Sequence, residues 1–218
     1  MFGRTFFYCC ALASHSRRLP TPAFALGRII SVVAVLLLPI GLRAANSGSQ
    51  EQGGINVGER APGFTLKDQN GQDVSLDGLL KKGPVALVFF RSSDWCLACK
   101  TQLIKLQRHT KEFEVAGGQL VGISYDSAKS LKCFADKRSI LFPVLSDTGS
   151  KVIDAYGVRD PVEDLGPKGV ARHIAIVVDQ KGIVRGKRYG VIYDERPGVD
   201  DLVQMFKEAQ NPVGGTTQ

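Results

Sequence analysis

The residues best suited to chemistry in this sequence are two cysteines, Cys96 and Cys99, separated by two residues. On a helix, this spacing places both sulfurs on one face, where they can close a disulfide or bind a metal ion. A structural zinc site needs four ligands, and the sequence after residue 44 offers no second cysteine pair or histidine cluster. The pattern favours thiol–disulfide chemistry without a metal or an organic cofactor, and a passive disulfide is the alternative.

The segments around the two cysteines are those of a strand followed by a helix. Residues 85–90 (VALVFF) form an apolar run typical of a strand buried on both faces, and residues 97–115 have apolar positions at helical spacing. Cys96 is then at the start of the helix, where unpaired backbone N–H groups and the helix dipole favour a thiolate. We therefore assign Cys96 as the attacking cysteine and Cys99 as the resolving one, with Lys100 adding a positive charge nearby.

The rest of the chain predicts a mixed α/β domain. Alternating residues at 64–66 and 72–76, around a turn at Asn70-Gly71, predict an N-terminal β-hairpin. Further strands are expected at 119–124, 174–179 and 183–187, and further helices at 127–138, 151–156 and 199–209. Cys133, at an apolar-spaced position of the second helix, is expected to be buried and without a redox role. This order predicts a mixed central sheet flanked by helices, which is the thioredoxin-like arrangement.

The positive charge of the chain is concentrated at its N-terminus. The 218 residues are 44% apolar and 22% charged, as in an ordinary globular protein, and carry a formal net charge of +7. Residues 1–44 contain five arginines and no acidic residue, which leaves 23 basic and 21 acidic residues in the remainder. Because these remaining residues are nearly balanced in charge and contain no stripe of basic residues, we expect no nucleic-acid partner.

The N-terminal segment has the pattern of an export signal. An apolar run at residues 29–42 follows Arg17, Arg18 and Arg28 and precedes Ala44-Ala45. Residues 1–44 are therefore predicted to be a signal peptide, or an N-terminal membrane anchor that tethers the protein through residues 23–42; a transit peptide is a further alternative. The protein is expected to be exported, to the periplasm or another extracytoplasmic place, or anchored there. A linker at 45–54, a folded domain at 55–211 and a flexible tail at 212–218 are expected to follow.

Residues 55–191 resemble the alkyl hydroperoxide reductase / thiol-specific antioxidant (peroxiredoxin-like, redoxin) family of the thioredoxin superfamily. The resemblance rests on five stretches: VGERAPGFTLKDQNGQDVSL from Val57, VALVFFRSSDWCLACKTQL from Val85, GISYDSAKSLKCFADKRSILFPVLSD from Gly122, KVIDAYGV from Lys151 and RHIAIVVDQKGIVR from Arg172. It implies a thioredoxin-like fold and an antioxidant oxidoreductase.

The resemblance also implies supporting residues at the site. In peroxidase members, the attacking cysteine follows a Pro-x-x-x-Thr/Ser-x-x-Cys pattern, which Cys96 and Ser93 match, whereas Phe89 stands at the proline position. An arginine from a later strand lies near the thiolate in this family, and Arg172 is the residue that matches it.

The loop that contains the two cysteines is more similar to thioredoxin itself. Trp95 immediately precedes Cys96 and Lys100 immediately follows Cys99, as in the thioredoxin active-site segment. Ala171 occupies the neighbourhood in which thioredoxins have a cis-proline. The sequence is therefore intermediate between the two kinds of protein.

Three functions are compatible with these residues. The first is a thiol peroxidase in which Cys96 attacks a peroxide, Cys99 resolves the product, and an external thiol or thioredoxin-like donor reduces the disulfide. The second is a thioredoxin-type reductase of protein disulfides that uses the same two cysteines. The third is a copper-binding carrier with His173 as a further ligand, although the cysteines of such carriers are spaced by three residues rather than two.

The export-signal pattern in residues 1–44 predicts that the mature protein lacks this segment. We expect N-terminal sequencing of the protein isolated from its native cells to begin close to Ala45, because the small residues there follow the apolar run. A product that keeps residues 1–44 in the detergent-soluble membrane fraction would instead indicate an uncleaved anchor.

Overall fold

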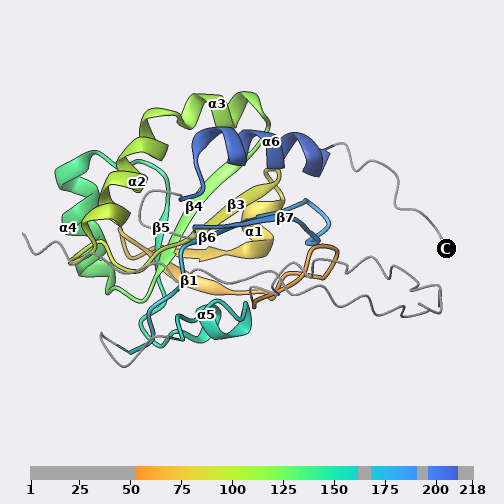
Figure 1. Ribbon diagram of the computed structural model, residues 1–218. Helices are drawn as coiled ribbons and strands as arrows, with labels where there is room; N and C mark the ends of the chain where they lie inside the picture. Colours follow the sequence, from red (N-terminus) through yellow and green to blue (C-terminus); the bar gives the residue numbers. More distant parts are fainter. Residues whose placement is uncertain (1–52, 162–167, 191–195, 211–218) are drawn as a thin grey trace, which may run out of the picture. The chain divides into compact units, whose positions relative to one another are not determined.

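The computed structural model describes residues 53–161, 168–190 and 196–210, which form a sheet with helices on both faces (Figure 1). The leader predicted at 1–44 and the tail predicted at 212–218 lie outside the described residues, as does most of the predicted linker. Within the described ranges, no helix combines the length and apolar character needed to cross a membrane.

The described strands form one mixed sheet in the order β2-β1-β5-β4-β3-β6-β7. Strands β3, β4 and β5 are parallel, whereas β6 and β7 extend the sheet on one side, and β1 and β2 on the other, in antiparallel pairing. The strands are β1 (Thr65–Asp68), β2 (Asp73–Ser75), β3 (Val85–Phe89), β4 (Gln119–Ser124), β5 (Val144–Ser146), β6 (Ile174–Val178) and β7 (Val184–Tyr189). This architecture confirms the predicted thioredoxin-like α/β fold and its N-terminal β-hairpin.

The apolar run around β3 is buried on both faces, as predicted. Successive side chains of a strand point to opposite faces, so Ala86 and Val88 belong to one core, and Val85 and Leu87 to the other. Helices α2, α3, α4 and α6 pack on the first core, and α1 and α5 on the second. The helices are α1 (Leu76–Leu80), α2 (Leu97–Arg108), α3 (Thr110–Val115), α4 (Ala128–Arg138), α5 (Lys151–Ala155) and α6 (Val199–Gln210).

The topology brings three chain segments to one edge of the sheet. Strand β3 ends at Phe89, and the chain then leads through a short loop into α2. Because β4 runs parallel to β3, its C-terminal end and the following Tyr125 and Asp126 lie at the same edge. Because β6 runs antiparallel to β3, it is the residues before β6, including His173, that lie there.

Two short elements were not predicted from the sequence. Helix α1 has five residues and β5 has three, and neither is long enough to display a clear periodicity. Ser75 is the N-cap of α1, and its hydroxyl accepts a hydrogen bond from the Gly78 N–H at 3.1 Å. This cap ends β2 at Ser75, one residue before the strand end predicted at Leu76.

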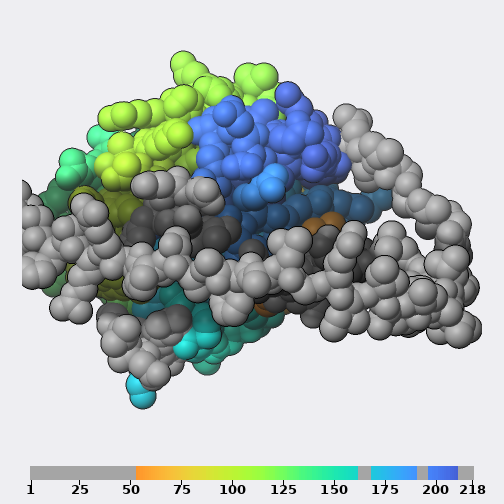
Figure 2. Space-filling model, in the orientation of Figure 1, coloured from red at the N-terminus to blue at the C-terminus, as the bar shows by residue number. Residues whose placement is uncertain are grey.

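The helix predicted at residues 97–115 is in fact two helices, separated at His109. The backbone of His109 has φ −113° and ψ 16°, outside the helical region, and the Thr110 hydroxyl donates to the Gln107 carbonyl. The change of direction brings Phe113 of α3 against Phe206 of α6, with ring centroids 6.3 Å apart. Figure 2 shows α3 in green and α6 in blue covering the same face of the protein.

The prediction that Cys133 is buried was wrong, because this side chain is exposed. The buried face of α4 consists of Leu131, Phe134 and Ala135. Two residues correspond to roughly 200° around a helix, so Cys133 lies nearly opposite Leu131.

Candidate active site

Cys96 is the N-cap residue of α2, and Cys99 lies in the first turn of that helix. The Cys96 sulfur accepts a hydrogen bond from the Cys99 N–H at 3.3 Å. A sulfur at this place receives both an unpaired N–H group and the positive end of the helix dipole. The structure therefore positions Cys96 in the electrostatic environment that the sequence suggested.

The two sulfurs are joined in a disulfide, and the Cα atoms of Cys96 and Cys99 are 5.3 Å apart. Cys96 is 5% exposed and Cys99 is fully buried. Of the two cysteines, only Cys96 lines the neighbouring cavity, so an external molecule reaches this residue first.

The loop before Cys96 is held by the buried carboxylate of Asp126. The Ser92 hydroxyl donates to Oδ1 at 2.8 Å, and the N–H and hydroxyl of Ser93 donate to Oδ2 at 2.6 and 2.9 Å. All three residues are buried. The Ser93 hydroxyl thus donates its hydrogen bond to Asp126, so it can act only as an acceptor towards a ligand. Asp126 is the second residue after the end of β4, and polar residues at the carboxyl ends of parallel strands often contribute to a site.

Trp95 and Lys100 are both anchored beside the cysteines. The Trp95 indole donates to the Tyr125 hydroxyl at 2.8 Å, and the Arg91 guanidinium lies 4.9 Å from the centre of its ring. The Lys100 ammonium donates to the carbonyl oxygen of Asp94. Lys100 therefore directs its charge to the loop backbone.

The positive charge at the sulfurs comes from Arg196, which the sequence analysis missed. Its Nη1 lies 3.4 Å from the Cys99 sulfur and its Nη2 lies 3.9 Å from the Cys96 sulfur. The next residue, Pro197, accepts a hydrogen bond from the Gln102 side chain of α2 at 3.2 Å. No local pattern marks Arg196, because about a hundred residues separate it from the cysteines that it contacts.

Arg172, the arginine assigned through the resemblance, lies elsewhere. Its guanidinium lies beside Gly53, and its charge acts on the Tyr189 hydroxyl. The structure therefore brings Cys96, Cys99, Ser93, Trp95 and Lys100 together, but not Arg172.

The imidazole of His173 contacts Arg196 and lies close to both sulfurs. The two Nη atoms of Arg196 lie 3.1 and 3.0 Å from its Nδ1 and Nε2. Burial, followed by the charges of Arg196 and Arg91, lowers the pKa of His173 from 6.5 to about 3. The ring is therefore neutral at physiological pH, and it can accept only one hydrogen bond.

Cys96, Cys99 and His173 are close enough to share a ligand. One sulfur from each cysteine and one ring nitrogen all lie within 4.8 Å of one another. This is the arrangement that the copper-carrier hypothesis requires. However, the Arg196 guanidinium contacts all three residues, and its charge opposes a metal cation there.

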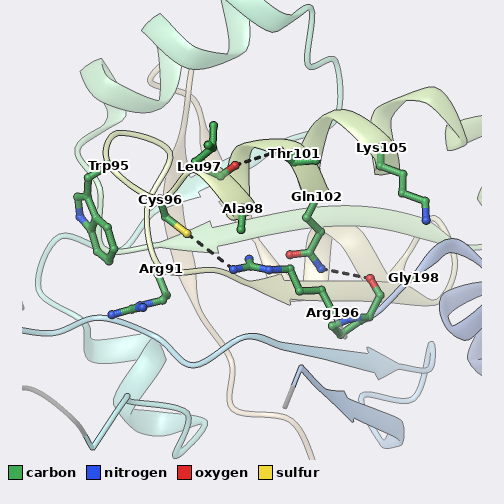
Figure 3. Close-up of a pocket in the computed structure, with 11 residues that line it drawn as sticks. Arg91, Trp95, Cys96, Leu97, Ala98, Thr101, Gln102, Lys105, Arg196 and Gly198 are labelled. Atoms are coloured by element: carbon green, nitrogen blue, oxygen red, sulfur yellow. Dashed lines mark hydrogen bonds between the residues drawn. The ribbon is translucent and has the colours of Figure 1, made fainter. Parts of the chain in front are cut away.

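A cavity of about 620 Å³ opens beside Cys96 and follows α2 (Figure 3). One end contains Trp95 and Arg91, the middle contains Arg196 and Gln102, and Lys105 stands at the far end. The described residues that line it are Arg91, Trp95, Cys96, Leu97, Ala98, Thr101, Gln102, Lys105, Arg196, Pro197 and Gly198.

Comparisons with known proteins agree with this geometry. Residues 57–187 match the model of the AhpC/TSA family. A chloroplastic peroxiredoxin Q of Triticum aestivum is 34% identical over 79% of this chain and 72% of its own length. Alkyl hydroperoxide reductase E of Mycobacterium bovis is 35% identical over 69% of this chain and 98% of its own. The crystal structure of peroxidoxin BcpB from Mycobacterium tuberculosis superposes with a TM-score of 0.63 at 25% identity, covering 74% of this chain and 99% of that one.

A CxxC disulfide at the start of a helix, on a thioredoxin-like sheet, is typical of thiol–disulfide redox proteins. Together with the family match, which covers more than half of the chain, this site identifies the class of the protein. The chain belongs to the AhpC/TSA family.

The buried, neutral state of His173 predicts a loss of stability in acid. The pKa of His173 is about 3 in the folded protein but near 6.5 when unfolded, so the unfolded chain binds more protons between these values. The free energy of unfolding should therefore fall as the pH drops from about 6.5 towards 3, by at most about 1.4 kcal/mol per pH unit from this residue. We expect His173→Gln to flatten that slope in urea unfolding. Equal slopes for His173→Gln and the wild type would contradict this account.

Proposed function

We propose that this protein is a thiol peroxidase that reduces hydroperoxides, with Cys96 as the attacking cysteine and Cys99 as the resolving one. The observation that carries the proposal is the position of the Cys96 sulfur, which lies at the N-terminus of α2, against Arg196 and at the edge of an open cavity. The relatives named peroxiredoxin and alkyl hydroperoxide reductase support this activity, as does membership of the AhpC/TSA family.

In the first step, the Cys96 thiolate attacks one oxygen of the peroxide and breaks the O–O bond. Cys96 becomes a sulfenic acid, and the other oxygen leaves as an alkoxide or hydroxide that takes up a proton. The peroxide is reduced by two electrons, which the sulfur supplies. The N–H of Cys99 and the guanidinium of Arg196 stabilise the thiolate before the attack.

In the second step, the Cys99 thiol attacks the sulfenic sulfur of Cys96 and releases water. The product is the disulfide that the structure contains. The two cysteines share one helical turn, so this bond forms without a large movement of the chain. An external thiol donor of the thioredoxin type then attacks the disulfide and returns both cysteines to the thiol form.

We assign to Arg196 the role that the family resemblance gives to Arg172. A guanidinium cannot lose its charge under ordinary conditions, so it favours the thiolate at every working pH. Arg196 contacts both sulfurs, whereas Arg172 lies beside Gly53.

A protein disulfide reductase remains the second candidate, and one observation favours it. Trp95 is 42% exposed and Leu97 is 77% exposed, so apolar side chains surround the accessible sulfur as on a protein-docking surface. The copper carrier is the weaker alternative because the Arg196 guanidinium contacts all three of its potential ligands, and its positive charge opposes a metal cation.

We further propose that residues 1–44 direct the folded domain out of the compartment in which it is made. The peroxiredoxin Q of Triticum aestivum that this chain resembles is named as chloroplastic, which supports import into an organelle as one form of such targeting. Export to the periplasm and anchoring through residues 23–42 remain predictions, since both depend on residues outside the described part of the chain.

Replacing each cysteine by serine separates the two proposed steps. Cys96→Ser should lower the rate constant for peroxide more than about a hundredfold, because the nucleophile is removed. Cys99→Ser should still react once and leave a sulfenic acid that dimedone traps, but turnover should stop. Rapid mixing with hydrogen peroxide, followed by the fluorescence of Trp95, the only tryptophan of the chain, measures the first step.

Cys133→Ser serves as the control, since Cys133 is exposed and lies outside the site. If the wild type reacts with peroxides no faster than a free thiolate but reduces insulin disulfides, the reductase is the correct function.

The two arginines can be compared directly. Arg196→Gln should lower the second-order rate constant for peroxide roughly tenfold to a hundredfold, the range that corresponds to the loss of one hydrogen bond to a charged group. It should also raise the pH midpoint of Cys96 alkylation by iodoacetamide, because the thiolate loses a positive neighbour. The matched variant Arg172→Gln should change neither quantity. The opposite result, with Arg172→Gln impaired and Arg196→Gln normal, would restore the assignment made from the family resemblance.

A further inference from the structure

The Arg196 guanidinium lies closer to the buried cysteine of the disulfide than to the accessible one. Its Nη1 is 3.4 Å from the Cys99 sulfur, whereas its Nη2 is 3.9 Å from the Cys96 sulfur. Stabilising the Cys96 thiolate before the attack on a peroxide uses only the longer of these two contacts. The shorter contact indicates a second role for this arginine, at Cys99.

The Cys99 sulfur has little else to stabilise a negative charge. Cys99 is fully buried, so water cannot solvate an anion there. Its own backbone N–H donates to the Cys96 sulfur. Among the residues that the structure describes, Arg196 is the one that donates a hydrogen bond to the Cys99 sulfur. A charge on Cys99 therefore depends on Arg196 more than a charge on Cys96 does.

The guanidinium is held beside the sulfurs by its neighbours. Its two Nη atoms lie 3.1 and 3.0 Å from the ring nitrogens of His173, which comes from the segment before β6. The carbonyl of Pro197, the next residue along the chain, accepts a hydrogen bond from the Gln102 side chain of α2 at 3.2 Å. A donor held in this way needs little reorganisation when charge develops on a neighbouring atom.

Opening of the disulfide places a negative charge on Cys99. Of the two cysteines, only Cys96 lines the cavity, so the thiolate of a reductant attacks the Cys96 sulfur. A new S–S bond forms there, the bond to Cys99 breaks, and its electron pair leaves with Cys99 as a thiolate. Thiol–disulfide exchange is faster when the leaving thiol has a lower pKa. The sulfur on which this charge develops is the one that Arg196 contacts at 3.4 Å.

We propose that Arg196 acts catalytically on Cys99 as well as on Cys96, by stabilising the negative charge on Cys99 when the disulfide opens and when it forms. In the opening step, Cys99 is the leaving group. In the forming step, Cys99 gives up its proton and attacks the Cys96 sulfenic acid. The S–S bond forms, the S–O bond breaks, and the hydroxide takes up the proton as water. The inference rests on the proposed roles of the two cysteines.

Reduction of the disulfide tests this role without any peroxide. The oxidised full-length protein is mixed with dithiothreitol, a small thiol that needs no docking surface, and the fluorescence of Trp95 follows the opening of the disulfide. Arg196→Gln should lower the second-order rate constant roughly tenfold to a hundredfold, the range that corresponds to one hydrogen bond to a charged group. Arg196→Lys, which keeps a positive charge without the planar fork, should lower it less.

Two comparisons separate this effect from damage to the fold. A loosened variant exposes the buried Cys99 and should be reduced faster, so slower reduction does not come from loosening. The matched variant Arg172→Gln, which removes a guanidinium beside Gly53, should leave the rate constant unchanged.

A free guanidinium ion should replace the missing side chain. Arg196 lines the cavity, so Arg196→Ala leaves a space that is open to small solutes. Millimolar guanidinium chloride should restore part of the rate of disulfide reduction in this variant, whereas sodium chloride at the same concentration should not. Equal restoration by the two salts would contradict the proposal, because general screening would then set the rate.

Formation of the disulfide gives a second, independent measurement. After the reduced protein reacts with hydrogen peroxide, dimedone competes with Cys99 for the Cys96 sulfenic acid, and mass spectrometry gives the fraction trapped. Arg196→Gln should raise this fraction, because the attack by Cys99 slows while the reaction with dimedone does not. The fraction is set after the first step, so a slower attack on the peroxide does not affect it.

The remaining results have separate meanings. If Arg196→Gln slows the reaction with peroxide but leaves disulfide reduction and dimedone trapping as in the wild type, Arg196 serves Cys96 alone and the inference is wrong. If the wild type reacts with peroxides no faster than a free thiolate, while Arg196→Gln still slows disulfide reduction, the peroxidase function is refuted and the role at Cys99 is retained.

Discussion

A thiolate that is almost shielded from water needs compensating charge from the protein, and this requirement governs the region around Cys96. Cys96 is only 5% exposed, so solvent can do little to stabilise an anion there. The Cys99 N–H at the start of α2 supplies one donor and Arg196 supplies a full positive charge. Both must be held in place, because a cation that moves away leaves a buried anion at a large cost in free energy.

The surrounding structure holds these groups through buried polar contacts. Asp126 fixes the loop before Cys96 through Ser92 and Ser93, and the Gln102–Pro197 hydrogen bond ties the segment of Arg196 to α2. These contacts connect the ends of β3 and β4 with the start of α6. Burial, together with the charge of the same arginine, lowers the pKa of His173 and keeps its ring neutral, so His173 adds no second charge beside the sulfurs near neutral pH.

The site combines features of two kinds of protein. The body of the domain belongs to the AhpC/TSA family, whereas the CxxC segment after Trp95 is similar to that of thioredoxin. The physical consequence is that the resolving cysteine is one helical turn from the attacking one, so the redox cycle can take place at a single cavity. Peroxide and reductant would then approach the Cys96 sulfur in turn, past the same exposed side chains of Trp95 and Leu97.

The sequence alone determined the features that depend on local pattern. The apolar run at 85–90 predicted the central strand, the helical spacing after it placed Cys96 at a helix start, and the two-residue gap predicted the disulfide. Element order was enough for the fold class. Local pattern was insufficient for α1 and β5, which are too short to show a period, and for the break at His109.

Only the tertiary structure decided which charges surround the sulfurs. Arg172 and Arg196 are both arginines distant in sequence from Cys96, and no periodicity distinguishes them. The antiparallel pairing of β6 with β3 brings His173 to the site, and the segment before α6 brings Arg196. The effect of a charge depends on its distance in space, whereas the sequence gives only distance along the chain. Arg196, the arginine that contacts both sulfurs, could therefore not be identified before the fold was known.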